Sequence, residues 1–192
     1  VIAEPTSIGD YPEAMDDYDL LPSGLIRLIK EGFNTGMDHS GAKLGQATSF
    51  HVGAALNLDP ADPVREISRL KGKLEAGADF LLTQPVFDVS RALAFIRRIR
   101  DEIDGFHTPL LAGILPLVNA RHAAFLNNEV PGITIHGDVI SRMEKAGEGG
   151  VVEGGSIAVD LIGKLKGQVA GVYLMPQFSR YDAVAEIIDA VK

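Results

Sequence analysis

Short apolar runs that alternate with helical segments are the feature that most constrains the fold of this chain. The clear apolar runs cover residues 49–57, 80–86, 109–117 and 171–175, and residues 1–3 form the end of another expected strand. The runs are largely apolar and do not alternate with polar residues, which is typical of parallel strands covered on both faces. The sequence therefore predicts an α/β protein built on a parallel sheet.

Helices are expected between these strands, over residues 23–33, 62–76, 90–103, 120–127, 156–166 and 181–191, with one more in the segment that follows residue 129. Ser23 is expected to cap the first helix, and Asp62-Pro63 is expected to open the second. The segment "GEGGVVEGG" lacks the GxGxxG pattern of a phosphate-binding turn. It is interpreted as a flexible, glycine-rich break.

Two architectures fit this order of elements: a doubly wound open sheet and an eight-stranded (β/α) barrel. Five strand–helix units are too few for a complete barrel, which typically takes about 250 residues. Because the chain opens on Val1, in an expected strand, we predict a partial (β/α)8 TIM barrel: strands 4 to 8 with their helices, the N-terminal strands missing. Residues 1–192 would be the C-terminal portion of that one domain. The open sheet remains the alternative.

Composition excludes several classes of function. A net charge of −8 with scattered Lys and Arg argues against nucleic acid as a partner. No apolar run approaches the roughly 18 residues of a membrane span, and the first residues lack a signal-peptide pattern. The absence of cysteine excludes thiolate metal sites and fits a reducing compartment, so a cytoplasmic location is expected. The five histidines show no metal-ligand spacing, and no metal site is expected.

Polar residues at the ends of the expected strands are the candidates for function, because parallel barrels place their sites there. Gln84 interrupts an apolar run. Its amide is costly to bury in an apolar core, but it can form hydrogen bonds with a heteroaromatic ring. Glu4 is the one residue among these strand ends that is ionisable near neutral pH. These strand-end residues predict a binding site for a planar ligand and a cofactor that supplies its own chemistry. A backbone-capping Gln84, a core Tyr173 and a solvated Glu4 remain open alternatives.

Several segments resemble one family. They are "SIGDYPEAMDDYD", "GLIRLIK", "RLKGKLEAGADFLLTQPVFD", "LLAGILPL", "NEVPGI", "RMEKAG" and "GVYLMPQFSRY", in this order. Together they resemble bacterial members of the methylenetetrahydrofolate reductase family over nearly the whole chain. The resemblance implies a (β/α)8 barrel that binds FAD. It also implies reduction of 5,10-methylenetetrahydrofolate to 5-methyltetrahydrofolate in one-carbon metabolism and methionine biosynthesis, with NADH or NADPH as electron donor.

The resemblance also assigns roles to individual residues. Gln84 matches a glutamine that hydrogen-bonds the folate pterin, and Tyr173 matches a tyrosine that lines the far side of the site. Glu4 is the predicted catalytic residue, close to flavin and pterin. The predicted contacts with FAD are Glu4, the small residues Ala54 and Ala55, and the helix residues Glu66 and Lys73.

The chain also departs from the family pattern. Ala3-Glu4-Pro5 replaces a "GDP" motif, which lengthens the carboxylate side chain. The family's general acid lies on the first barrel strand, so no residue here is assigned that role, and this fragment alone is expected to be inactive. One alternative is a flavin-less structural or regulatory subunit of a folate or corrinoid methyltransferase assembly. Another is a pterin-binding methyltransferase barrel. A homo-oligomer, or a methyltransferase as partner or fusion, is also expected.

Overall fold

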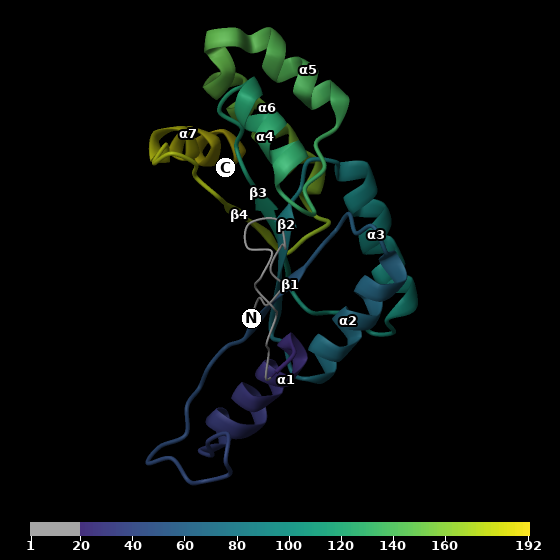
Figure 1. Cartoon of the computed structure of the whole chain (residues 1–192), viewed down its shortest axis with the longest axis vertical. Helices are drawn as coiled ribbons and strands as arrows, with labels where there is room; N and C mark the ends of the chain where they lie inside the picture. Colours follow the sequence, from purple (N-terminus) through teal and green to yellow (C-terminus); the bar gives the residue numbers. More distant parts are fainter. Residues whose placement is uncertain (1–19) are drawn as a thin grey trace, which may run out of the picture.

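A parallel sheet of four strands forms the centre of the described chain (Figure 1). The computed structural model describes residues 20–192, so the expected strand at residues 1–3 and the predicted catalytic Glu4 lie outside the described residues. The strands are β1 (Gly53–Leu56), β2 (Phe80–Pro85), β3 (Leu110–Ile114) and β4 (Gly171–Leu174). They are adjacent in chain order, and all three pairs are parallel. The reversal of order that a doubly wound sheet requires does not occur among these strands.

Helices separate the strands along the chain. They are α1 (Pro22–Arg27), α2 (Pro63–Glu75), α3 (Val89–Glu102), α4 (Ala120–Glu129), α5 (Gly137–Ala146), α6 (Gly150–Leu165) and α7 (Tyr181–Val191), with short pieces η1 (Leu28–Gly32), η2 (Phe33–Thr35) and η3 (Gly147–Gly149). Figure 1 shows α2 and α3 along one side of the sheet, and α4 and α5 at the end of the molecule opposite α1. Within residues 20–192, no helix has the length and apolar character that a membrane span requires.

The two faces of the sheet differ in burial. One face packs into the core through Ala54, Leu56, Leu81, Leu110, Ala112 and Ile114, none of which is more than 6% exposed. On the other face Ala55, Leu82 and Leu111 lie side by side in register and are only half-buried. Within the described residues, the predicted burial is therefore complete on one face of the sheet and partial on the other.

Helix α2 begins and ends as the sequence predicts. The carboxylate of Asp62 accepts a hydrogen bond from the N–H of Arg65 at 3.0 Å, and Pro63 occupies the first turn. Gly77 follows the helix with φ of 96°, a left-handed conformation that favours glycine.

The first helix differs from the prediction in its cap. It begins at Pro22 after Leu21, and no side chain caps it, so Ser23 lies inside the helix instead of capping it. Proline has the backbone angle that a first helical turn needs, which explains this earlier start. The helical path continues as a π-helix, η1, and a 3-10 turn, η2, to Thr35.

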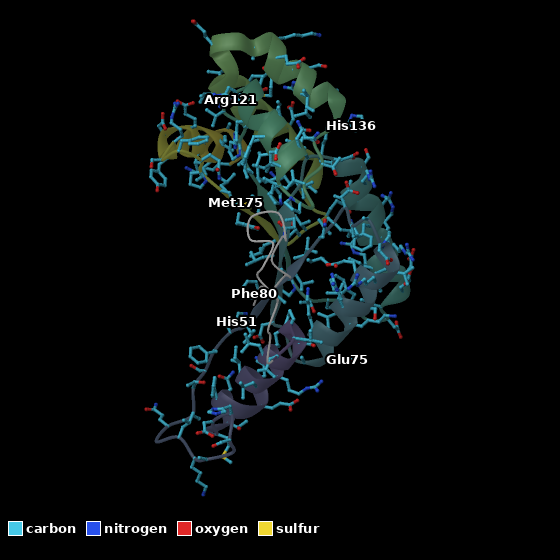
Figure 2. All side chains as sticks on the ribbon, in the orientation of Figure 1. His51, Glu75, Phe80, Arg121, His136 and Met175 are labelled. Carbon is cyan, nitrogen blue, oxygen red and sulfur yellow. The ribbon has the colours of Figure 1, made fainter. Side chains whose placement is uncertain are left out.

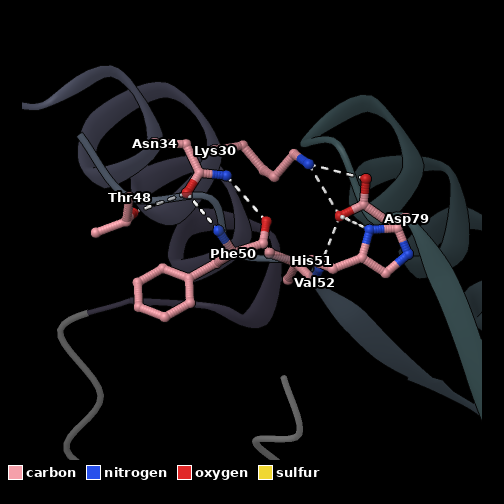
Figure 3. Close-up of polar contacts among 7 residues, drawn as sticks. All are labelled: Lys30, Asn34, Thr48, Phe50, His51, Val52 and Asp79. Carbon is pink, nitrogen blue, oxygen red and sulfur yellow. Dashed lines mark hydrogen bonds and ion pairs between the residues drawn. The ribbon is translucent and has the colours of Figure 1, made fainter.

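Strand β1 is shorter than predicted because its first half is held by a side chain. The amide oxygen of Asn34 accepts hydrogen bonds from the hydroxyl of Thr48 and the N–H of Phe50, both at 2.8 Å (Figure 3). The amide nitrogen of Asn34 donates to the carbonyl of Phe50 at 2.9 Å. These bonds occupy backbone groups that a strand would pair, so pairing with β2 begins at Gly53.

The glycine-rich segment is helical, and its interpretation as a flexible break is wrong. Helix α6 starts at Gly150 and runs through Gly154. A Cβ atom at Gly154 would lie 1.8 Å from the carbonyl oxygen of Leu117, and one at Gly150 would lie 2.6 Å from that of Val118. These glycines therefore let the helix approach the backbone that follows β3.

Candidate functional site

The carboxyl end of β2 contains an irregularity that exposes Gln84. The pairing of β2 with β3 shifts between Leu82 and Pro85. The hydroxyl of Thr83 accepts a hydrogen bond from the N–H of Gly113 at 2.9 Å and donates to the carbonyl of Gln84 at 2.7 Å. The side-chain amide of Gln84 is exposed and makes no hydrogen bond within the described part of the chain. It is therefore available to a ligand.

Tyr173 reaches this irregularity from β4, across β3. Its hydroxyl donates a hydrogen bond to the carbonyl of Thr83. A Cβ atom at Gly113 would lie 2.9 Å from both of these oxygens, so the glycine leaves the space that the tyrosine occupies. Burial raises the pKa of Tyr173, which keeps the hydroxyl protonated as a donor. The structure thus brings Tyr173 to the residue that precedes Gln84.

A cavity lies at the carboxyl ends of β1 and β2. Its lining includes Asn57, Gln84 and Thr134, and also the apolar residues Val86 and Phe87. The amide oxygen of Asn57 accepts from the N–H of Asp59 at 2.8 Å, which fixes the orientation of this side chain. The cavity is small, about 10 Å³. At its lining, the Gln84 amide makes no hydrogen bond to the described part of the chain, so the two amides offer both donors and acceptors.

Glu66 and Lys73 are buried between α2 and β1, each 8% exposed. The carboxylate of Glu66 accepts from the N–H of Asn57 at 3.1 Å, and the amine of Lys73 donates to the carbonyl of Ala55 at 2.7 Å. Both backbone groups point away from β2, because β2 pairs with alternate residues of β1. The two side chains therefore form hydrogen bonds with backbone groups on the outer edge of β1, at its carboxyl end.

The two predicted alanines lie on opposite faces of the sheet. Ala54 is 1% exposed and lies in the core, so the structure does not bring its methyl group to an open surface. Ala55 is half-buried on the face that also carries Leu82 and Tyr173. Of the pair, only Ala55 is placed to leave space for a planar group on that face.

Sequence reasoning missed two side chains at the neighbouring strand ends. His122, at the start of α4, is 7% exposed, and its Nδ1 accepts from the N–H of Val118 at 3.3 Å. This agrees with the interpretation of the histidines as satisfied polar groups. Phe178, in the loop after β4, contacts the His122 ring edge-on at 5.4 Å between centroids. The order "MPQFSRY" contains no period or spacing that would have indicated this contact.

Aromatic residues also occupy the opposite, amino end of the sheet. The rings of His51 and Phe80 stack with centroids 5.5 Å apart, and Figure 2 labels both beside β1, away from Met175 at the end of β4. A Cβ atom at Gly53 would lie 2.5 Å from the Phe80 ring. The amino end of β1 is therefore closely packed against the Phe80 ring.

Comparison with known families decides which family this chain belongs to. The sequence profile described as methylenetetrahydrofolate reductase matches residues 9–192. The chain belongs to the methylenetetrahydrofolate reductase family. This match confirms the resemblance that the motifs around Gln84 and Tyr173 indicate.

Three relatives carry the name of this reductase. Methylenetetrahydrofolate reductase 2 of Saccharomyces cerevisiae is 27% identical over 71% of this chain and 22% of its own length. Methylenetetrahydrofolate reductase 1 of Schizosaccharomyces pombe is 37% identical over 50% of this chain and 14% of its length. A probable methylenetetrahydrofolate reductase (NADH) of Oryza sativa subsp. japonica is 26% identical over 64% and 22%. The chain spans about a fifth, or less, of these relatives.

A solved structure is also similar to this reductase-family chain. It is an uncharacterized protein from Clostridium thermocellum, described as binding two copies of 5-methyl-5,6,7,8-tetrahydrofolic acid. The similarity covers 73% of this chain and 51% of that one, with 18% sequence identity and a TM-score of 0.49.

Proposed function

We propose that this chain forms part of a flavin-dependent reductase that converts 5,10-methylenetetrahydrofolate to 5-methyltetrahydrofolate. The observation that carries the proposal is the exposed amide of Gln84, at the irregular end of β2, in a chain of this reductase family. Among residues 20–192 this amide has no hydrogen-bond partner. An amide with two donors and one acceptor complements a pterin ring, which presents both kinds of group. Tyr173 supports this amide through Thr83.

The chemical contribution of these residues is orientation. In the reaction, the carbon of the ring-opened iminium accepts a hydride, and N10 keeps the proton that it gains when the ring opens. Gln84 would hold the pterin so that this carbon faces the hydride donor, and such positioning provides much of the acceleration in enzymes. Glu4 is proposed to adjust the charge beside the pterin. It lies outside the described residues.

The residues that the family resemblance assigns to the cofactor lie beside β1, where Glu66 and Lys73 are buried. Ala55 leaves space on the half-buried face of the sheet, and the amine of Lys73 lies 2.7 Å from its carbonyl. Glu66 has one oxygen on the N–H of Asn57, and its other oxygen lies 4.0 Å from Arg69. We propose that Lys73 faces the phosphates of FAD and Glu66 its ribose. When bound, reduced flavin supplies the hydride, and NADH or NADPH restores it.

We further propose that the four strands are an arc of a closed parallel barrel. The support is the sequential strand order and the difference between the two sheet faces. An eight-stranded barrel fills its interior with side chains from such a face, and its sites lie at the carboxyl ends of the strands. The half-buried Ala55, Leu82 and Leu111 would then belong to the barrel interior.

A Gln84→Ala variant of the full-length natural protein tests the proposed function. We expect the dissociation constant for 5-methyltetrahydrofolate to rise roughly tenfold, in line with the loss of one or two hydrogen bonds. Bound flavin, measured by its visible absorbance, should stay unchanged. Titration calorimetry measures the folate, and the matched control is Gln168→Ala, an exposed glutamine that precedes β4.

The outcomes separate the parts of the proposal. Equal folate affinity in the parent and in Gln84→Ala would remove the role of Gln84. A parent protein that binds folate without flavin would contradict the flavin-dependent reaction and favour a flavin-less subunit. A parent protein that binds no folate would overturn the proposed function itself.

A further inference from the structure

An open groove lies at the amino ends of β3 and β4, at the opposite end of the sheet from Gln84. Its volume is about 250 Å³, whereas that of the cavity beside Gln84 is about 10 Å³. The groove is lined by Ile96 and Arg100 of α3, by residues 106–110 before and at the start of β3, and by residues 167–170 before β4. Strands of five or six residues rise about 3.3 Å per residue, so roughly 15–20 Å separate the groove from the end of β2. The groove is therefore a second, separate space.

The floor of the groove is apolar. Ile96 and Leu110 are 3% and 6% exposed, and Phe106 and Val169 are half-buried members of the same lining. An enclosed apolar cavity of about 150 Å³ holds a benzene molecule, so the groove has room for a chain of several carbons. Such a lining favours the apolar part of a ligand.

The guanidinium of Arg100 gives the groove a positive charge. Its Nη2 donates a hydrogen bond to the carbonyl of Gln168 at 2.9 Å. Among residues 20–192 this is the one hydrogen bond of the Arg100 side chain, which forms no ion pair there. Arg98, on the same helix, instead pairs with Glu102 at 2.6 Å. Because arginine presents five donors in a rigid fork, a guanidinium held by one nitrogen still offers donors at fixed positions.

Two further side chains extend the polar rim of the groove. His107 is exposed and Thr108 is half-buried, and neither side chain forms a hydrogen bond within the described part of the chain. Among residues 20–192 the lining contains no Asp or Glu, although the whole chain has 26 of them against 18 Lys and Arg. The groove thus concentrates donors and positive charge in an acidic protein, which favours an anion.

Both walls of the groove are anchored to the sheet. The N–H of Leu81 donates to the carbonyl of Pro109 at 2.8 Å, and the N–H of Ala170 donates to the carbonyl of Leu110 at 2.9 Å. These bonds fix the segments that enter β3 and β4. A preformed site loses little conformational freedom when a ligand binds, which increases affinity.

We propose that this groove binds a small carboxylate that carries a short apolar chain. The carboxylate accepts hydrogen bonds from the N–H groups of Arg100 that do not bond Gln168, in the planar pairing that arginine favours. The apolar chain lies over Ile96 and Leu110. Inorganic phosphate has the charge but no apolar chain, so it would use only part of the groove. This site goes beyond the proposed reaction, because it lies at the end of the sheet opposite Gln84.

Ligand-observed NMR titration of the full-length natural protein with pentanoate tests this site. We expect a dissociation constant of about 1 mM, a value typical of a weak, open site. Acetate lacks the apolar chain and 1-pentanol lacks the charge, so each should bind about tenfold more weakly or worse. Saturating 5-methyltetrahydrofolate should leave pentanoate binding unchanged, because the two sites are separate.

Two variants locate the bound pentanoate. Arg100→Gln should weaken its binding about tenfold. Arg97→Gln removes the same charge from an exposed position of α3 and is the matched control, with a change of less than about twofold. In Ala170→Glu, Arg100 is kept, and the introduced carboxylate occupies its donors, so pentanoate binding should be lost. Urea unfolding shows whether each variant is folded.

The outcomes decide the inference without touching the proposed function. No pentanoate binding by the parent protein, or equal affinity in the parent and in Arg100→Gln, would overturn the site. Displacement of pentanoate by 5-methyltetrahydrofolate would place it in the folate site and would overturn the inference as well. Tighter binding of inorganic phosphate than of pentanoate would overturn the assignment of a carboxylate with an apolar chain. Each of these results leaves the role of Gln84 to its own test.

Discussion

The Gln84 amide owes its exposed position to hydrogen bonds that its neighbours make. Thr83 uses its hydroxyl to satisfy both Gly113 and the carbonyl of Gln84, and Tyr173 satisfies the carbonyl of Thr83. These backbone groups at the irregular end of β2 are therefore paired, whereas the side chain of Gln84 makes no hydrogen bond within residues 20–192. The hydroxyl of Tyr173 contacts this backbone, and its predicted contact with the substrate stays a prediction.

Removal of the Tyr173 hydroxyl tests this arrangement. Tyr173→Phe should lower the free energy of unfolding by about 1–2 kcal/mol, because a partly buried carbonyl loses its donor. It should also raise the dissociation constant for folate, since the end of β2 becomes less fixed. Urea unfolding and calorimetry measure the two effects. Tyr181→Phe, at a residue that is 68% exposed, is the control. Unchanged stability with weaker folate binding would instead favour direct contact.

At the scale of elements, the glycines of α6 show two uses of one residue type. Gly154 faces the backbone after β3, where a Cβ atom would overlap the carbonyl of Leu117. Gly163, on the same helix, has open space where its Cβ would lie. The sequence shows only that both positions are glycine, and a run of glycines is equally consistent with a flexible segment. Only the packing of α6 on the segment after β3 shows that Gly154 is needed for close contact and Gly163 is not.

The two glycines predict opposite responses to alanine. Gly154→Ala should destabilise the protein by about 3 kcal/mol or more, because the added carbon meets backbone that cannot move without displacing β3 or α6. Gly163→Ala should stabilise it by up to about 1 kcal/mol, the difference in helix propensity. Thermal and urea unfolding of both variants give the comparison. A Gly154→Ala protein as stable as the parent would contradict this close packing of α6.

Elements with a local signal were predictable from the sequence. Asp62, Pro63 and Gly77 carry the cap, the first turn and the left-handed end of α2, and the bounds of that helix follow. The early part of β1 was not predictable, because it depends on Asn34, fourteen or more residues away. The candidate site also has a part that was predictable from the sequence and a part that was not. Gln84 visibly interrupts an apolar run, while the preceding residue, Thr83, is bonded by Tyr173, ninety residues after Thr83.

At the scale of the whole molecule, one carboxylate joins the first helical segment to the sheet. Asp79, just before β2, accepts from the amine of Lys30 at 2.8 and 2.9 Å and from the N–H of Val52 at 2.6 Å (Figure 3). His51 lies 3.6 Å away. Burial alone would raise the pKa of Asp79, but the hydrogen bonds from Lys30 and Val52 outweigh it and lower the pKa below the ordinary 3.8.

This carboxylate predicts a specific pH dependence of stability. Because the folded state lowers the pKa of Asp79, its contribution is present above the unfolded value of 3.8 and is lost as the pH falls through the lower, folded value. Lys30→Met should reduce the free energy of unfolding by about 1–2 kcal/mol near neutral pH. The difference from the parent should shrink as the pH falls below 3.8 and through the lower pKa of the folded state, where Asp79 gains its proton. Urea unfolding across this range measures both, with Lys71→Met, an exposed lysine of α2, as the control. A difference that stays constant down to pH 3 would show that the stem of Lys30, packed over Gly77, and not its charge, fixes the first helical segment to the sheet.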